Sequence, residues 1–396
     1  MQPYSLYLHI PFCKHRCAYC DFNTYAGLEH ILPDYVTSLC RELGWLAHSA
    51  ESHLPVYTIF FGGGTPSLLP VEELEKILSV IFRDYELLPD SEVTLEANPG
   101  TLSLDYLRNL HQLGINRLSL GVQSADPGEL RLLERQHDYK DVVDAVHWAR
   151  QAGFDNINLD MIYGLPYQGI ETWEGSLRRV LGLEAEHLSL YALTLEHGTP
   201  MQKWVARGLM AEPDADLAAD MYDLAREMLD RHGYVQYEIS NWARSSAGGE
   251  IAICRHNLQY WRLLPYLGFG AGAHGFVDST HTANVLSPAV YIQRLQAADC
   301  EDGDRGLFPR TPASASVNKL DQLEEMGEFM MMGLRLVQEG VSDEVFRQRF
   351  GCGLVEVYSS QIEGLLEKSL LEWRKESLCL TGAARLLGNQ VFVEFI

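Results

Sequence analysis

The stretch YLHIPFCKHRCAYCDF, residues 7–22, decides how the rest of the sequence is interpreted. It begins inside residues 5–10, a short apolar segment with the length and composition of a buried β-strand. Directly after that strand, Cys13, Cys17 and Cys20 form a CxxxCxxC array. Three thiols at this spacing can face one metal ion or one cluster at the end of the strand.

Alternating strands and helices follow the cysteine array. Apolar segments predict strands at residues 5–10, 56–62, 92–97, 117–122, 156–162 and 187–193. Amphipathic patterns predict helices near residues 33–50, 71–85, 103–113, 126–134, 139–152 and 170–183. About six βα units predict an α/β fold with a parallel sheet, arranged as a partial (β/α) TIM-like barrel. The periodicity leaves open whether the barrel closes.

Two smaller parts are predicted after the barrel. We expect a barrel core at residues 1–210, a connecting region at 211–316 and a C-terminal domain at 317–396. Within the connecting region the patterns predict a helix at 214–232, an edge strand at 233–243 and irregular structure over 244–316. The C-terminal domain should be winged-helix-like, with a helix at 319–337, a second helix ending at Gly351, and a hairpin of LLEWRKESLCLT (370–381) and NQVFVEFI (389–396).

Composition and charge exclude several classes of protein. The 396 residues are 46% apolar, which is enough for a large core. Lys and Arg number 31 against 54 Asp and Glu, and the net charge of −23 disfavours nucleic acid and anionic membranes as partners. The start has no signal-peptide pattern, and no apolar run reaches the roughly 18 residues of a transmembrane segment. We therefore expect a cytoplasmic protein with reduced thiols.

Two kinds of metal site fit the cysteine array by itself. A 4Fe-4S cluster on three thiolates leaves one iron open, and S-adenosylmethionine can bind that iron through its amine and carboxylate. A structural zinc ion wants four protein ligands, so His9 or His15 would have to complete the site. The array favours the cluster and leaves zinc open. The remaining cysteines are isolated and are expected to be ordinary thiols; they are Cys40, Cys254, Cys300, Cys352 and Cys379.

Polar residues stand at or near the ends of several predicted strands. Glu96, Gln123 and Asp160 close or follow strands, and Arg135 lies in the next loop or helix end. Ligand groups of α/β barrels lie at the carboxyl ends of the strands, so these side chains should converge on one mouth. Together they suit a ribose, a carboxylate and an adenine, although each alone would also suit an ordinary rim position.

The cysteine array after the first strand and FFGGGTP (60–66) after the second together resemble the radical S-adenosylmethionine family. The resemblance implies a 4Fe-4S cluster on Cys13, Cys17 and Cys20, with S-adenosylmethionine bound beside it. It places Tyr7 next to the cofactor and the methionine moiety on Gly63, Gly64 and Thr65. It makes four residues the lining of the cofactor pocket, namely Glu96, Gln123, Arg135 and Asp160.

Within that family, residues 4–276 resemble the branch of oxygen-independent coproporphyrinogen III oxidase (a dehydrogenase) and the HemW-type heme chaperones, through LEANP, GVQS and NLDMIYGLP as well as the cysteine segment. The oxidase pattern has another Cys two residues after the third cluster Cys, where this chain has Phe22. It also has a substantial N-terminal extension, whereas six residues precede Tyr7 here. Both departures favour the chaperone, with radical decarboxylation of coproporphyrinogen as the alternative.

The segment HNLQYW, residues 256–261, matches the HNxxYW pattern of the chaperones. A neutral His256 would be an axial ligand to heme iron, with Tyr260 and Trp261 as flat apolar surface and Arg255 or Arg262 near a propionate. A histidine beside aromatic residues also suits an ordinary packed position. The resemblance implies a protein that binds heme and passes it to acceptor hemoproteins.

Overall fold

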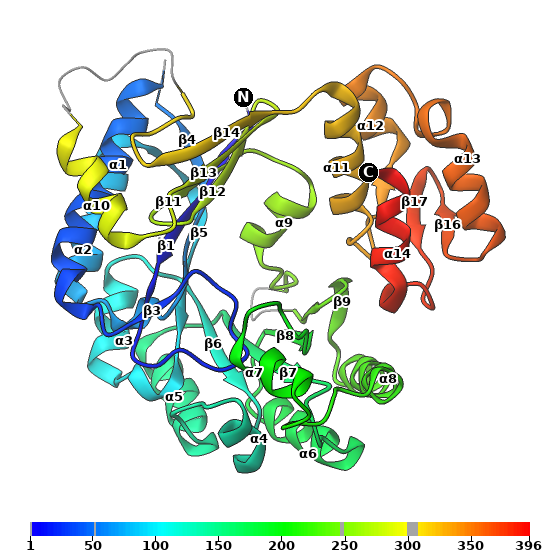
Figure 1. Ribbon diagram of the computed structural model, residues 1–396, viewed down its shortest axis with the longest axis horizontal. Helices are drawn as coiled ribbons and strands as arrows, with labels where there is room; N and C mark the ends of the chain where they lie inside the picture. Colours follow the sequence, from blue (N-terminus) through cyan, green and yellow to red (C-terminus); the bar gives the residue numbers. More distant parts are fainter. Residues whose placement is uncertain (1, 51–52, 246–248, 299–307) are drawn as a thin grey trace.

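The computed structural model describes residues 2–50, 53–245, 249–298 and 308–396, and it has the expected α/β fold. Six strands run parallel, each beside the next in chain order: β1 (Tyr4–Ile10), β4 (Pro55–Gly63), β5 (Glu86–Ala97), β6 (Arg117–Gln123), β7 (Ile157–Tyr163) and β8 (His187–Ala192). The helices between them cover the outer side of the curved sheet (Figure 1); they are α1 (Leu32–Ser49), α2 (Val71–Asp84), α3 (Leu104–Gln112), α4 (Pro127–Leu132), α5 (Tyr139–Ala152) and α6 (Ile170–Leu181). The predicted strands and helices of the barrel are therefore confirmed.

The barrel is open. On one side β8 is followed by β10 (Asn241–Ala243) and β9 (Val235–Glu238), and on the other side β1 pairs with β11 (Tyr266–Phe269). The sheet then continues through β12 (His274–Val277), β13 (Thr280–Asn284) and β14 (Ser314–Lys319). Among the described strands, none joins β9 to β14, so the twelve strands form a curved sheet with two edges.

Two expectations for the connecting region are wrong. The edge strand predicted at 233–243 is two antiparallel strands, because the Glu238 carboxylate accepts the Ser240 N–H at 3.0 Å and the Asn241 amide, which turns the chain. The part predicted as irregular contains α9 (Arg255–Trp261), β11 to β14 and α10 (Pro288–Ala297). These strands are short and rich in Gly, Thr and His, so they lack the apolar alternation that reveals a strand. The helix predicted at 214–232 is present as α8 (Ala215–Arg231), after α7 (Pro200–Ala206).

A buried carboxylate joins the barrel to the part of the connecting region that follows α9, which we call the extension. Glu42 of α1 is fully buried and accepts four hydrogen bonds, from the Gly270 N–H at 2.8 Å, Asn284 Nδ2 at 2.7 Å, Tyr291 OH at 2.6 Å and Thr311 Oγ1 at 2.8 Å. Each donor comes from the extension, so the single carboxylate fixes several of its loops at once. Cys300, expected to be an ordinary thiol, lies outside the described residues.

Alternate residues of each parallel strand separate the main core from a polar interior. In β6, Leu118, Leu120 and Val122 belong to the core under the helices. Arg117, Ser119, Gly121 and Gln123 face the concave side instead. The concave side of the sheet is therefore lined by polar groups rather than filled by apolar ones.

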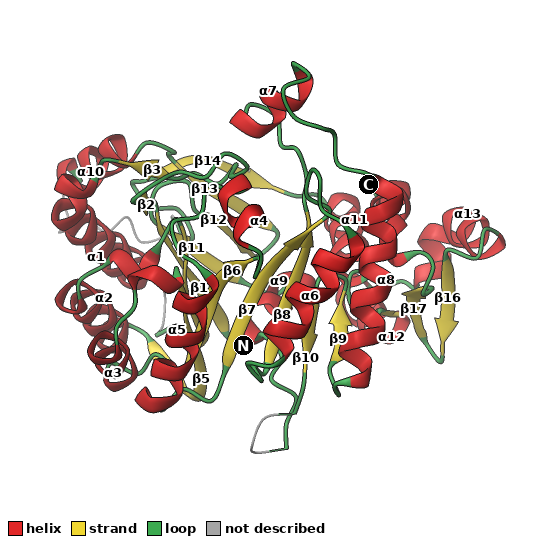
Figure 2. Ribbon diagram, turned by 90° about the horizontal axis from the view of Figure 1, so that it is seen from below, coloured by secondary structure: helices red, strands yellow, loops and turns green. Residues whose placement is uncertain are grey.

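The C-terminal domain has its own core beside the open barrel (Figure 2). It contains α11 (Gln322–Gly333), α12 (Asp343–Phe350), α13 (Leu354–Glu367) and a small sheet of β15 (Val341–Ser342), β17 (Ser377–Leu380) and β16 (Leu371–Arg374). The two predicted helices are confirmed, but the predicted hairpin of residues 370–381 with 389–396 is wrong, because β16 and β17 pair with each other within residues 370–381. NQVFVEFI is not a strand but α14 (Gly388–Phe392) and a 3₁₀ turn, because Val391, Phe392 and Phe395 pack into this core at helical spacing. Among the described helices, none is both long and apolar enough to cross a membrane.

Candidate functional site

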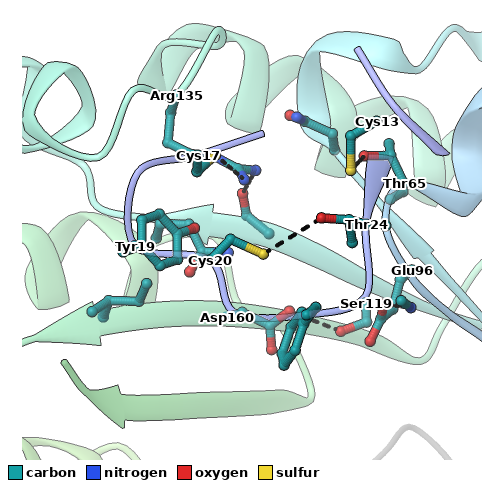
Figure 3. Close-up of a pocket in the computed structure, with 18 of the residues that line it drawn as sticks. Cys13, Cys17, Tyr19, Cys20, Thr24, Thr65, Glu96, Ser119, Arg135 and Asp160 are labelled. Carbon is teal, nitrogen blue, oxygen red and sulfur yellow. Dashed lines mark hydrogen bonds between the residues drawn. The ribbon is translucent and has the colours of Figure 1, made fainter. Parts of the chain in front are cut away.

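A cavity of about 650 Å³ opens at the carboxyl ends of the parallel strands. The cysteine loop lies over it, between β2 (Phe12–Cys13) and β3 (Tyr25–Ala26). Figure 3 shows this loop with Glu96 and Asp160 below it. We call this space the barrel cavity. Of the nine predicted cluster and cofactor residues with side chains, eight line it, namely Cys13, Cys17, Cys20, Thr65, Glu96, Gln123, Arg135 and Asp160.

Each of the three cysteines has a polar neighbour in the cavity. Thr65 Oγ1 donates to Cys13 Sγ at 3.6 Å, and Arg135 Nη1 donates to Cys17 Sγ at 3.8 Å. Cys20 Sγ lies 3.9 Å from Thr24 Oγ1. All three thiols are free (Figure 3). Donors beside sulfur stabilise negative charge there, as thiolate ligands require.

The histidines that would complete a zinc site are engaged elsewhere. His9 uses both ring nitrogens, since Nδ1 lies 3.0 Å from Tyr7 OH and Nε2 lies 2.9 Å from the Asn23 carbonyl oxygen. His15 Nε2 lies 3.2 Å from the Glu134 carboxylate. Within the described ranges, no group of His, Cys, Asp and Glu side chains could hold a single ion. A four-iron cube spaces its ligands farther apart than one ion does, so this observation bears on zinc alone.

The glycine-rich turn lies directly against the cysteine loop. The Gly64 N–H donates to the Ile10 carbonyl at 2.8 Å, and the Thr65 N–H donates to the Phe12 carbonyl at 2.8 Å. Gly63 has a φ of +111°, and a Cβ there would lie 2.5 Å from the His9 ring. A Cβ on Gly64 would lie 2.6 Å from the Phe12 carbonyl oxygen. Both positions therefore require glycine, and the bare backbone lets a ligand approach closely.

The strand-end carboxylates Glu96 and Asp160 both line the barrel cavity and are half-buried. Glu96 accepts the Gly63 N–H at 3.0 Å, and its burial, together with the charge of Asp160, raises its pKa to about 7. Burial also raises the pKa of Asp160, which accepts hydrogen bonds from Ser119 at 3.0 Å and Asn158 at 2.8 Å. Gln123 follows them with a φ of +66°. A cationic ligand beside the two carboxylates would favour their ionised forms.

Sequence reasoning missed several further polar residues that line the barrel cavity, among them Arg117, Ser119 and Asn158 on the inner face of the strands. Their signal was present in RLSLGVQ and NLD, where a polar residue occupies every second position. That alternation indicates a strand whose inner face is polar. A search limited to strand ends does not find these residues, because they lie within the strands.

Tyr7 and the predicted heme residues His256, Tyr260 and Trp261 are not part of the barrel cavity lining, although Asn257 of the same HNLQYW segment is. Tyr7 lies behind Phe60, with their ring centroids 6.2 Å apart. His256 is 1% exposed, with Nδ1 2.7 Å from Thr58 Oγ1 and Nε2 2.8 Å from Tyr260 OH. Burial and then the Arg117 charge lower its pKa to about 3, so its ring is neutral. Trp261 lines a separate cavity of about 770 Å³ beside the C-terminal domain.

The residues of the barrel cavity fit the two groups that the resemblance implies. Three thiols on one loop suit an iron–sulfur cluster, and half-buried carboxylates beside a glycine turn suit a zwitterionic cofactor. Four buried polar atoms of lining residues also have no hydrogen-bond partner among the described residues: Asn98 Oδ1, Arg117 Nε, Arg135 Nε and His137 Nδ1. Unpaired buried groups of this kind are expected where a polar ligand completes the site.

Comparison with known proteins agrees with this geometry. Residues 7–180 match a family model described as the Radical SAM superfamily, and residues 320–387 match one described as the HemN C-terminal domain. The chain is 38% identical over 394 residues to the "Heme chaperone HemW" of Bacillus subtilis (strain 168), covering 99% of each chain. It is 35% identical to the protein of that name from Lactococcus lactis subsp. lactis (strain IL1403), covering 100% of this chain and 98% of the other. The chain belongs to the HemW family of radical SAM proteins.

Membership of the HemW family confirms the resemblance predicted from the sequence. A solved structure, the coproporphyrinogen III oxidase HemN from Escherichia coli, matches with a TM-score of 0.82 and 22% identity, over 99% of this chain and 90% of that one. At this identity the match shows the shared fold alone. It extends through the C-terminal domain, so the HemW-family chain keeps both parts of that architecture.

Proposed function

We propose that this protein is a cytoplasmic heme chaperone, which binds heme and passes it to acceptor hemoproteins. The observation that carries the proposal is the full-length similarity to proteins named heme chaperones, at 38% identity in the Bacillus subtilis case. The sequence supports it with HNLQYW and with Phe22, which stands where the oxidase pattern has a cysteine. The partners would be heme and acceptor proteins, with no nucleic acid.

The proposal includes two resident cofactors, a 4Fe-4S cluster on Cys13, Cys17 and Cys20 and S-adenosylmethionine beside it. A bound cluster would supply one electron at its open iron. Gly63, Gly64 and Thr65 would hold the methionine moiety against the cysteine loop. The other pocket residues would orient the rest of the cofactor; they are Tyr7 from behind Phe60, and Glu96, Gln123, Arg135 and Asp160 from the cavity wall.

Heme binding is proposed at the HNLQYW helix, with His256 as the iron ligand and Tyr260 and Trp261 beside it. The neutral imidazole has the protonation state that a metal ligand needs. Its Nε2 is hydrogen-bonded to Tyr260 in the described conformation, so ligation requires that contact to open.

Four measurements on the whole chain test the proposal. Anaerobic reconstitution with iron and sulfide should yield the visible absorbance of a 4Fe-4S cluster in wild type and Cys352→Ala, whose cysteine lies in the C-terminal domain, but not in Cys17→Ala. Titration with hemin should give a Soret band, and mixing the loaded protein with apomyoglobin should move heme to the acceptor. Incubation with coproporphyrinogen III should give no protoporphyrinogen. Sustained conversion would establish the oxidase instead, and a protein that binds no heme would end the chaperone proposal.

A further inference from the structure

Arg117 is a buried arginine without a partner. It stands at the start of β6, is 2% exposed and lines the barrel cavity. A strand rises about 3.3 Å per residue, so Arg117 lies about 20 Å from Gln123 at the mouth end of the same strand. Its guanidinium makes no hydrogen bond or ion pair with any other described residue, and Nε is buried without a partner. Buried arginines are normally paired, so this one requires an explanation.

The acidic groups near Arg117 use their oxygens elsewhere. Glu92 accepts the backbone N–H groups of Arg255 at 3.0 Å and His256 at 3.1 Å. The two oxygens of Asp160 accept hydrogen bonds from Asn158 and Ser119. The charges of Glu92 and Asp160 lie close enough to balance the charge of the Arg117 guanidinium. Neither carboxylate accepts a hydrogen bond from it. The donors of Arg117 therefore remain free for a ligand.

The surrounding floor of the barrel cavity suits a carboxylate on a short hydrocarbon arm. Asn257 and Cys254 line the floor with Arg117, and the Asn257 amide makes no hydrogen bond with a described residue. The Phe60 ring forms an apolar wall and stacks on His256 at 4.9 Å. A guanidinium fork binds a carboxylate through two parallel hydrogen bonds, and an amide can add a third.

We propose that Arg117 is the carboxylate-binding residue of the barrel cavity and that it receives a propionate of heme. The choice of heme rests on the proposed function, since heme carries two propionates on two-carbon arms. The two arginines that the sequence suggests for this role already have partners. Arg255 Nη1 donates to the Asp90 carbonyl at 2.8 Å, and Arg262 forms an ion pair with Glu339 at 2.7 Å. Of the three, Arg117 is the one whose donors are unused.

The first experiment titrates the full-length protein with hemin and with its dimethyl ester, in which both propionates are esterified. Wild type and the exposed-arginine control Arg231→Met should bind hemin about tenfold more tightly than the ester, as expected for a charge-assisted pair. Arg117→Met should bind the two compounds equally, and Arg117→Lys should fall between. An unchanged preference in Arg117→Met would overturn the proposal.

The second experiment needs no heme and separates this proposal from the proposed function. Sodium propionate, compared with sodium chloride at equal ionic strength, should raise the thermal midpoint of wild type and Arg231→Met but not of Arg117→Met. If hemin fails to bind while propionate stabilises wild type, the chaperone proposal fails and the carboxylate subsite stands. Without ligand, Arg117→Lys keeps the charge that balances Glu92 and Asp160 and should melt with wild type, because the guanidinium has no hydrogen bond to lose among the described residues. A clear drop would show that Arg117 is a structural residue and would overturn the proposal.

Discussion

Replacing Glu96 with Gln should remove a pH dependence from S-adenosylmethionine binding. Burial and the neighbouring Asp160 charge raise the pKa of Glu96 to about 7 in the empty cavity. S-adenosylmethionine carries a sulfonium and an ammonium group, so it should bind the ionised carboxylate and not the neutral acid. The contribution of Glu96 to affinity is therefore present above pH 7 and is lost as the pH falls below it.

The size of the effect follows from that pKa. With a pKa of about 7, about 9% of Glu96 is ionised at pH 6 and about 91% at pH 8. If the cofactor binds only the ionised form, Glu96 strengthens binding about tenfold across this range. The amine of the ligand titrates as well, at about pH 8, but equally for every variant. The informative quantity is thus the ratio of the Glu96→Gln Kd to the wild-type Kd, which should rise about tenfold from pH 6 to pH 8.

Calorimetry on anaerobically reconstituted protein measures this ratio. Glu129→Gln is the matched control, because Glu129 is buried and also has a raised pKa, but it bonds to Ser124 outside the cavity lining. Its ratio to wild type should stay constant with pH. A constant ratio for Glu96→Gln as well would refute the assignment of Glu96 to the cofactor.

Three predictions concern stability and are checked by chemical denaturation. Burial raises the pKa of Glu238 to about 7, so the folded state prefers the protonated form. The free energy of unfolding of wild type should therefore fall by about 3 kcal/mol relative to that of Glu238→Gln as the pH rises from about 4.5 to 7. Equal pH profiles of the two proteins would contradict this. Gly63→Ala should lower the free energy of unfolding by about 2 kcal/mol or more, because Gly63 has a positive φ. Gly175→Ala should raise it by about 0.5–1 kcal/mol, because Gly175 lies in α6 with open space around it. Effects of the same sign would contradict the geometry. Glu42→Leu should cost about 3 kcal/mol or more, since four buried donors lose their acceptor, and a neutral effect would mean that the extension is held by other contacts.

The barrel was predictable because its strands are long, apolar and separated by amphipathic helices. The extension was not, since β13 reads THTAN and acquires its structure by pairing with β12 and β14. NQVFVEFI shows the opposite failure. Its apolar residues fit both an alternating strand and a short helix, and packing against the C-terminal core decided for the helix.

The sequence motifs predicted which residues lie together at the mouth of the barrel. The cysteine array, the glycine turn and the strand-end residues gather in one cavity, as barrel topology requires. The motifs did not predict the floor of the barrel cavity. There, α9 and the residue before it come from a distant part of the chain and place Asn257 and Cys254 beside Arg117. No local pattern encodes that juxtaposition. Only the three-dimensional arrangement shows that Asn257 of the HNLQYW helix and the predicted cofactor residues border the same cavity.

The hydrogen bonds of His256 give a direct test of its role as a heme ligand. Thr58 Oγ1 donates to Ser5 at 2.6 Å, so it accepts from the Nδ1–H of His256, which leaves the Nε2 lone pair to accept from Tyr260 OH. An oriented Nδ1–H and a lone pair on Nε2 are what a metal-binding histidine needs, and Tyr260 covers that lone pair.

Tyr260→Phe removes this competing hydrogen bond without changing the ring. If iron binds Nε2, hemin affinity should rise about fivefold, the equivalent of about 1 kcal/mol for one hydrogen bond, and His256→Ala should abolish the low-spin Soret spectrum. Tyr266→Phe is the control, since its ring lies 4.6 Å from Tyr260 but its hydroxyl does not contact His256. If neither Tyr260→Phe nor His256→Ala alters hemin binding, His256 serves only to join α9 to the strands, and the iron ligand must be sought elsewhere.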